Sequence, residues 1–158
     1  ALLARRLVER GVRYVEVTSN RSWDSMHGGS GNLGNLANEL DGTVSSLMTD
    51  LRDRGMLDST MIVVTSEFGR TPKVKGNGGR DHHPNGFSAM LAGGGIKGGI
   101  AVGETDENGR DPFPEYEPKN LHATIAEALG MTGTKIRRLP GRPSFLGGKP
   151  KPVKEILA

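Results

Sequence analysis

The stretch Met61-Ile62-Val63-Val64-Thr65-Ser66-Glu67-Phe68-Gly69-Arg70 decides how this sequence is interpreted. Its first half is a short apolar run rich in β-branched residues, which predicts a buried strand. Polar residues and a glycine follow at once, so the strand ends in a loop that carries Glu67 and Arg70. Open α/β sheets bind ligands beyond the carboxyl ends of their strands. The stretch therefore predicts both a sheet and the position of a site beside it.

Segments with helical and β-strand patterns alternate along the rest of the chain. A stripe of apolar residues at spacings of three and four predicts an amphipathic helix that ends near Arg54. The stripe consists of Leu36, Leu40, Val44, Leu47 and Leu51. Val12–Val17 and Phe87–Ala92 are β-rich, and we expect both to share one sheet with Met61–Thr65. This alternation predicts an α/β fold in which a mostly parallel sheet is sandwiched by helices.

The length of 158 residues is one domain's worth of chain. We expect residues 1–132 to form part of an α/β domain whose last helix runs from Leu121 to Leu129, with Asn120 as its N-cap. Residues 133–158 are rich in Gly, Pro and Lys and are expected to be a peripheral tail. The 24 glycines and the hydrophobic fraction of 34% indicate a loop-rich chain or a piece of a larger one. Because the chain starts without Met inside a helical pattern, we expect a segment to precede it.

Composition excludes several classes of function. The net charge of +3 is small and scattered, so we expect no nucleic-acid partner, which would need a clustered basic face. No apolar run approaches the roughly 18 residues of a membrane span, so we expect no membrane partner. The absence of cysteine excludes disulfides, thiolate metal sites and a cysteine nucleophile.

Three of the four histidines lie beside carboxylates in polar loops. The candidate metal ligands are Asp24, His27, Glu67, Asp81, His82 and His83. Carboxylate and imidazole groups together suit a divalent cation, and three protein ligands with one water form an open catalytic site. The alternative is that these residues are simply solvated. Glu67 is a candidate ligand or base, or else a salt-bridge partner of Arg70. Arg70 is a candidate clamp for phosphate or sulfate, or a residue that orients Glu67.

Three blocks of the sequence resemble the DUF1501 family, which is sulfatase-like and belongs to the alkaline phosphatase superfamily. The blocks are Glu67-Phe68-Gly69-Arg70-Thr71-Pro72, Gly79-Arg80-Asp81-His82-His83-Pro84-Asn85-Gly86-Phe87 and Leu91-Ala92-Gly93-Gly94-Gly95-Ile96-Lys97-Gly98-Gly99. The resemblance implies a doubly wound α/β sandwich with two metal sites. It assigns Asp24, His27 and either His82 or His83 to one metal. At the second site Glu67 stands for the usual Asp, and Phe68 stands where a histidine ligand would be.

The resemblance implies a sulfatase/phosphatase-like, metal-dependent hydrolase fragment that acts on sulfate or phosphate esters. Its cofactor would be a divalent metal (zinc, calcium, manganese or magnesium), and Glu67 and Arg70 would be catalytic. The family's nucleophile region is absent from this chain, so we expect the chain alone to be a poor hydrolase. The alternative function is a non-catalytic binding or scaffold domain on the same fold. The expected macromolecular partner is a preceding part of the protein or a second copy, in an exported or periplasmic bacterial setting.

Overall fold

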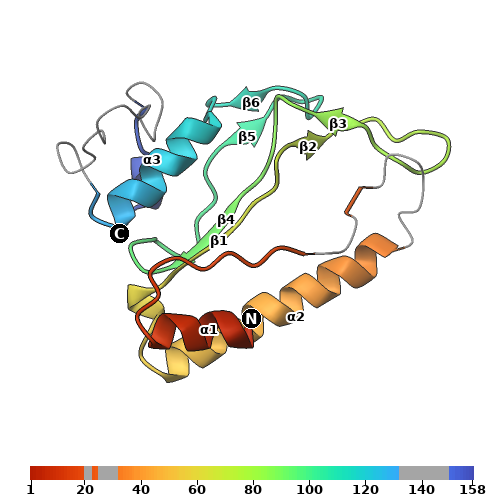
Figure 1. The fold of residues 1–158 in the computed structure, drawn as a ribbon. Helices are drawn as coiled ribbons and strands as arrows, with labels where there is room; N and C mark the ends of the chain where they lie inside the picture. Colours follow the sequence, from red (N-terminus) through yellow and green to blue (C-terminus); the bar gives the residue numbers. More distant parts are fainter. Residues whose placement is uncertain (20–22, 25–31, 132–149) are drawn as a thin grey trace, which may run out of the picture.

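The computed structural model describes residues 1–19, 23–24, 32–131 and 150–158. Its elements are α1 (Leu2–Glu9), α2 (Leu33–Asp53), η2 (Leu57–Ser59), β1 (Met61–Val64), β2 (Gly69–Arg70), β3 (His82–His83), β4 (Met90–Gly93), β5 (Glu104–Thr105), β6 (Pro112–Phe113), α3 (Pro118–Ala128) and η4 (Lys154–Ile156). Figure 1 shows the β1–β4 ladder between α2 on one side and α3 on the other. The fold is thus a mixture of helices and strands, as the alternating sequence pattern predicts.

The described strands pair only in antiparallel fashion, in three two-stranded sheets. β1 and β4 lie side by side, with Met61 opposite Gly93 and Val64 opposite Met90, which confirms that these two predicted strands share a sheet. The mostly parallel sheet sandwiched by helices is not found among the described residues. A parallel connection needs a long crossover, usually a helix. The chain between β1 and β4 instead forms the β2–β3 hairpin and returns alongside the strand that it left.

Residues 12–17 form no strand, although their sequence is β-rich. Tyr14 is 78% exposed and Val17 is 64% exposed. A β pattern becomes a strand only when another strand completes its hydrogen-bond ladder, and no described residue pairs with this segment. The expectation that it joins the β1–β4 sheet is therefore wrong for the part of the chain that the structure describes.

Both predicted helices are confirmed, with one difference at a cap. α2 covers the leucine stripe and ends at Asp53 with Arg54 as its C-cap, and Gly55 follows with φ 66°. α3 begins one turn earlier than expected, because Pro118 is compatible with the first helical turn. Glu117 is the N-cap, and Asn120 completes a capping box from the third helical position. Among the described residues, no helix combines the length and apolar character needed to cross a membrane.

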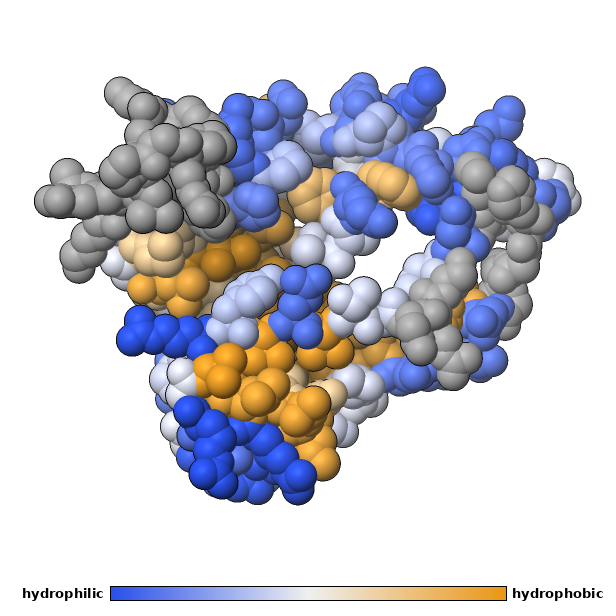
Figure 2. All heavy atoms as spheres, in the orientation of Figure 1, coloured by the Kyte–Doolittle hydropathy of each residue, from blue (hydrophilic) through white to orange (hydrophobic). Residues whose placement is uncertain are grey.

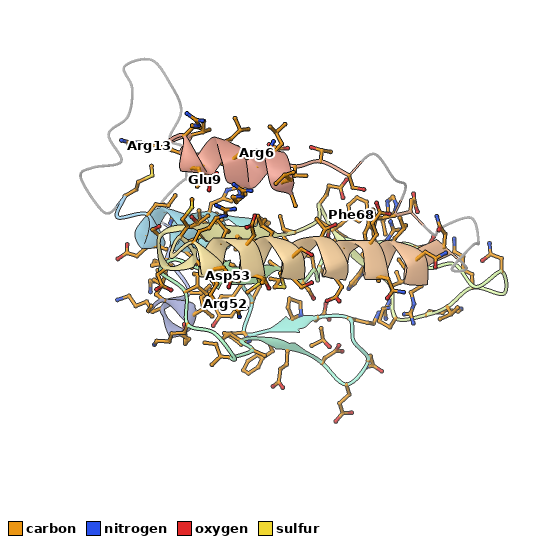
Figure 3. The ribbon with its side chains drawn as sticks, turned by 90° about the horizontal axis from the view of Figure 1, so that it is seen from below. Arg6, Glu9, Arg13, Arg52, Asp53 and Phe68 are labelled. Carbon is orange, nitrogen blue, oxygen red and sulfur yellow. The ribbon has the colours of Figure 1, made fainter. Side chains whose placement is uncertain are left out.

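An ion-pair ring joins α1 to the end of α2. Arg5 and Arg54 each contact both Glu9 and Asp50, so that two cations and two carboxylates alternate. Arg5 is only 8% exposed, and Figure 3 shows Glu9 between the two helices. The hydrogen bond from Arg54, followed by that from Arg5, lowers the pKa of Asp50. The ring therefore fixes α1 against α2 with compensated charge.

Among the described residues, few apolar side chains are buried, and they come from both helical layers, from β1 and from the C-terminal segment. They are Leu36, Leu51, Ile62, Ala123, Ala126 and Val153. Figure 2 shows apolar surface gathered across the centre of this view, between the two helical layers. Residues 150–158 of the expected tail pack on α3, where Val153 N–H donates to Thr124 Oγ1 at 2.8 Å. The last residues of this C-terminal segment also pair with the turn after β4, where Ile96 and Leu157 form an antiparallel bridge.

Candidate metal and oxyanion site

The β2–β3 hairpin places two of the three sequence blocks quoted above, those that begin at Glu67 and Gly79, opposite each other. Arg70 and His82 are directly paired across the hairpin, as are Gly69 and His83. Thr71 N–H continues the pairing by donating to the Asp81 carbonyl at 2.9 Å. The hairpin is closely packed at Gly69, where an added Cβ would lie 1.8 Å from the Gly86 carbonyl oxygen. Because glycine has no Cβ, the backbone at Gly69 can lie this close to the backbone at Gly86.

Asp24 reaches this hairpin from the N-terminal part of the chain. Arg70 Nη1 donates to Asp24 Oδ1 at 2.9 Å, and His82 Nε2 lies 3.4 Å from Asp24 Oδ2. The side chains are 27% exposed for Arg70 and 42% exposed for both His82 and Asp24. The structure thus brings together one candidate from each of three separate sequence blocks, in a position open to solvent.

Phe68 packs against the same cluster. Its ring centroid lies 4.0 Å from that of His82, with an angle of 31° between the two planes. The guanidinium carbon of Arg70 lies 5.6 Å from the Phe68 centroid, within cation–π range. Figure 3 shows Phe68 among the side chains that gather beside α2 in that view. The residue that replaces a metal-binding histidine in the family resemblance therefore faces the candidate site.

Glu67 does not join this cluster. The chain bends at Glu67, before β2 begins at Gly69, and of the residues just ahead of β2 it is Phe68 that contacts His82 and Arg70. Glu67 instead lines a hollow of about 470 Å³ together with Asp111 and Glu115, among others. Arg70 pairs with Asp24, so the salt bridge between Glu67 and Arg70 is not formed.

The remaining candidates have other partners or lie outside the described residues. Asp81 forms an ion pair with Lys75 Nζ at 2.5 Å. His83 Nε2 lies 2.5 Å from the Arg110 carbonyl oxygen, so this nitrogen is the proton donor. His27 falls in residues 25–31, which the structure does not describe. Its predicted role as a ligand stays a prediction.

Arg70 keeps most of its donor capacity. Besides Asp24, Nη1 contacts only the Arg80 carbonyl, at 3.4 Å. Within the described ranges, no acceptor is bonded to Nε or Nη2 of Arg70. These two nitrogens form the planar fork with which arginine binds two oxygens of a phosphate, sulfate or carboxylate. An oxyanion can therefore bind Arg70 without displacing Asp24.

The described side chains of the cluster supply some, but not all, of the ligands that a divalent cation needs. No three His, Asp or Glu side chains among the described residues form a group that could hold a metal ion. Asp24 Oδ2 and His82 Nε2 are nevertheless 3.4 Å apart. Two ligands of a tetrahedral ion with bonds of about 2.0–2.1 Å are separated by roughly the same distance. The pair could share one ion if a third ligand comes from residues 25–31, which include His27 and lie outside the described residues.

The sequence profile of the family described as "Protein of unknown function (DUF1501)" matches residues 1–157. The chain belongs to the DUF1501 family. No curated protein and no solved structure matches it. The DUF1501 match includes the part of the chain after residue 132, which the sequence alone assigns to a peripheral tail. It also includes all three residues of the Asp24–Arg70–His82 cluster, so this geometry lies within the DUF1501 region.

Proposed function

We propose that the Asp24–Arg70–His82 cluster binds a divalent cation together with the oxyanion of a sulfate or phosphate ester. In this proposal the protein is related to sulfatases and phosphatases of the alkaline phosphatase superfamily. The complete fold of the protein would then be the sandwich of that superfamily, in which helices cover both faces of a mostly parallel sheet. The observation that supports the proposal is the convergence on Asp24 of an imidazole and a guanidinium with an open fork.

Each residue has a separate role in this proposal. Asp24 and His82 hold the cation, and His27 is the third ligand. Arg70 binds two oxygens of the sulfate or phosphate group and offsets its negative charge. A bound cation would supply Lewis-acid polarisation of an ester oxygen and would acidify a bound water. Glu67 lines a separate hollow. We propose it as a base, or as a ligand of a second cation, only if the site rearranges so that Glu67 joins the cluster.

The second candidate function is a non-catalytic binding domain on the same fold. The observation that favours it is the contact of Phe68 with His82, because a phenyl ring cannot ligate a metal. A site with Phe68 in place of an imidazole would keep oxyanion binding and lose the second cation. Fold alone does not decide between the two, since function depends on the groups in the site.

Turnover and binding assays on the same protein separate the two functions. We would measure hydrolysis of an aryl sulfate and an aryl phosphate with added zinc, manganese, calcium or magnesium, and binding of sulfate and phosphate by calorimetry. We expect metal-dependent oxyanion binding that Asp24→Asn abolishes and Glu107→Gln, in an exposed turn, does not. We expect little turnover from this chain, because it carries no residue that we assign as the nucleophile.

Robust turnover that His27→Ala abolishes would show that the chain is a complete hydrolase and exclude the binding-domain alternative. Metal-dependent oxyanion binding without turnover would support the binding domain. If neither a cation nor an oxyanion binds, or if Asp24→Asn leaves their binding unchanged, the proposed site is wrong.

A further inference from the structure

Four arginines gather around a hollow beside the carboxyl ends of α1 and α2. The volume of the hollow is about 550 Å³, within the range of roughly 300–1,000 Å³ that is usual for small-molecule sites. It is lined by Arg5, Arg6, Leu7, Glu9, Arg10 and Arg54. Basic residues that are scattered in the sequence therefore come together here in the fold.

The ion-pair ring compensates only two of these four positive charges. Arg5 and Arg54 pair with the carboxylates of Glu9 and Asp50. The other two arginines, Arg6 and Arg10, are exposed, and neither side chain has a hydrogen-bond or ion-pair partner among the described residues. The hollow thus carries two positive charges that no described carboxylate offsets.

We propose that this hollow is a binding site for a doubly charged tetrahedral oxyanion, a phosphate or sulfate group, which Arg6 and Arg10 hold beside the ion-pair ring. The site does not depend on the proposed function, because it shares no residue with the Asp24–Arg70–His82 cluster. Figure 1 shows α1 and the end of α2 near the start of β1, whereas the β2–β3 hairpin follows the end of β1.

The spacing of Arg6 and Arg10 suits one shared ligand. They are four positions apart at the end of α1, so their side chains lie on adjacent turns of the same helix face. Each guanidinium presents a planar fork that binds two oxygens of a phosphate or sulfate. A dianion would balance both uncompensated charges, whereas a monoanion would balance only one of them.

The ion-pair ring supplies further donors that are already held in place. Its hydrogen bonds use Nε and Nη1 of both Arg5 and Arg54, and no described residue accepts from Nη2 of either. Both side chains line the hollow, so each can donate from Nη2 while the ring stays intact. Arg5 is only 8% exposed, and its interaction with an anion is therefore less screened by water than that of a fully exposed arginine.

One feature of the helices opposes anion binding, and it is the smaller effect. The carboxyl end of a helix carries a partial negative charge of about half a unit. Arg10 and Arg54 are the C-cap residues of α1 and α2, so a full positive charge lies at each of these ends. The local balance still favours an anion.

The test is a calorimetric titration of the 158-residue chain with inorganic phosphate, in slightly alkaline, metal-free buffer of low ionic strength. Phosphate is a dianion under these conditions. We expect one phosphate per chain and weaker binding of acetate, a monoanion. Arg6→Gln and Arg10→Gln should each reduce the phosphate affinity roughly five- to tenfold, and the double variant should show no measurable binding. Arg6→Lys keeps the charge and loses the fork, so its loss should be smaller.

Two control variants separate this site from general charge and from the β2–β3 hairpin. Arg52→Gln removes one positive charge from the same end of α2, but Arg52 pairs with Asp53 and does not line the hollow. Figure 3 shows Arg6 on α1 and Arg52 on α2. Arg70→Gln removes the fork of the other proposed oxyanion site. Both controls should bind phosphate in metal-free buffer like the unmodified chain, and circular dichroism should show the same fold in every variant.

Each alternative outcome contradicts a different part of the inference. If Arg52→Gln weakens binding as much as Arg6→Gln does, phosphate responds only to net charge and the site is wrong. Equal affinity for acetate would overturn the choice of a dianion as ligand. If Arg70→Gln abolishes binding and the Arg6 and Arg10 variants do not, phosphate binds at the hairpin, so this inference fails and the proposed function gains support. No phosphate binding in metal-free buffer would also overturn the inference, and it would leave the metal-dependent binding proposed at Asp24 unaffected.

Discussion

Arg70 and Asp24 are 46 residues apart in the sequence, and Arg70 Nη1 donates to Asp24 Oδ1 at 2.9 Å. This pair ties Asp24, in the N-terminal part of the chain, to the β2–β3 hairpin. The hairpin in turn sets His82 opposite Arg70. The position of every member of the cluster therefore depends on the hairpin being correctly closed.

Closure of the hairpin should fail when Gly69 is replaced by alanine. The new Cβ would lie 1.8 Å from the Gly86 carbonyl oxygen, a backbone atom that can move only if the chain after β3 moves with it. We expect Gly69→Ala to lower the free energy of unfolding by roughly 2–3 kcal/mol and to abolish Mn²⁺ binding. Gly76→Ala is the control, because nothing lies within 4 Å of its Cβ. Equal stability of the two variants in urea titrations would contradict the hairpin geometry.

The contact between Phe68 and His82 should contribute to stability. Phe68→Leu keeps an apolar side chain and removes the ring that contacts His82 and Arg70. We expect a loss of about 1 kcal/mol in the free energy of unfolding, the usual contribution of an aromatic pair. In the double variant with His82→Leu the two losses should not add, since both remove one contact. If the two losses of stability add fully, the two rings are not in contact and the prediction is wrong.

The ion-pair ring between α1 and α2 predicts a specific loss of stability in acid. The pKa of Asp50 lies below its ordinary value of 3.8 in the folded chain, first because of the hydrogen bond from Arg54. The ionised group therefore stabilises the fold at every pH above about 4, and this contribution is lost as the pH falls through the lowered pKa. Asp50→Asn should lower the melting temperature at pH 6, and the difference from the unmodified chain should vanish in strong acid.

Asp53→Asn is the matched control for this prediction. Asp53 lies on the same helix, where its side chain is 67% exposed and 3.8 Å from Arg52. Figure 3 shows both residues on α2. We expect Asp53→Asn to have little effect on melting temperature at either pH. A pH-independent effect of Asp50→Asn would mean that its carboxylate is not what joins the helices.

The Thr124 hydroxyl should help to hold the start of the C-terminal segment on α3. Thr124 is fully buried, and its Oγ1 accepts from Val153 N–H at 2.8 Å and donates to the Asn120 carbonyl at 2.7 Å. Thr124→Val keeps the shape and leaves the Val153 N–H without an acceptor, which should cost about 1–3 kcal/mol. Thr124→Ser keeps the hydroxyl and should lose only about 1 kcal/mol for the missing methyl. If hydrogen exchange at Val153 is the same in both variants, the segment is held by other contacts.

The sequence predicts those elements whose causes are local. The leucine spacing of α2 and the β-branched run of β1 carry their structure within a few residues, and both are found. The direction of the β1–β4 pair is not a local property, because it depends on what the intervening 25 residues form. A turn signal was present in Lys75-Gly76-Asn77-Gly78-Gly79, where Lys75 N–H donates to the Gly79 carbonyl. It predicts the hairpin that reverses the chain.

The sequence predicts which residue types form the candidate site. It predicts less well which of these side chains pair with one another. Asp24 and His82 were expected in one site, and their side chains lie 3.4 Å apart. The pairing of Arg70 with Asp24 rather than Glu67 depends on which face of the chain each side chain occupies. The chain bends at Glu67, and Phe68 rather than Glu67 lies against Arg70. Spacing in the sequence does not show where such a bend falls, so it left Glu67 open as a partner of Arg70.

The most direct test of a cation site at Asp24 is one calorimetric titration with Mn²⁺, made on the unmodified chain, on three single variants of the proposed ligands and on one control variant. The account predicts one ion per chain, with affinity reduced at least roughly tenfold in Asp24→Ala, His27→Ala and His82→Ala. Glu107→Gln should bind like the unmodified chain. Unchanged binding in both Asp24→Ala and His82→Ala, or no binding to the unmodified chain, would contradict the account.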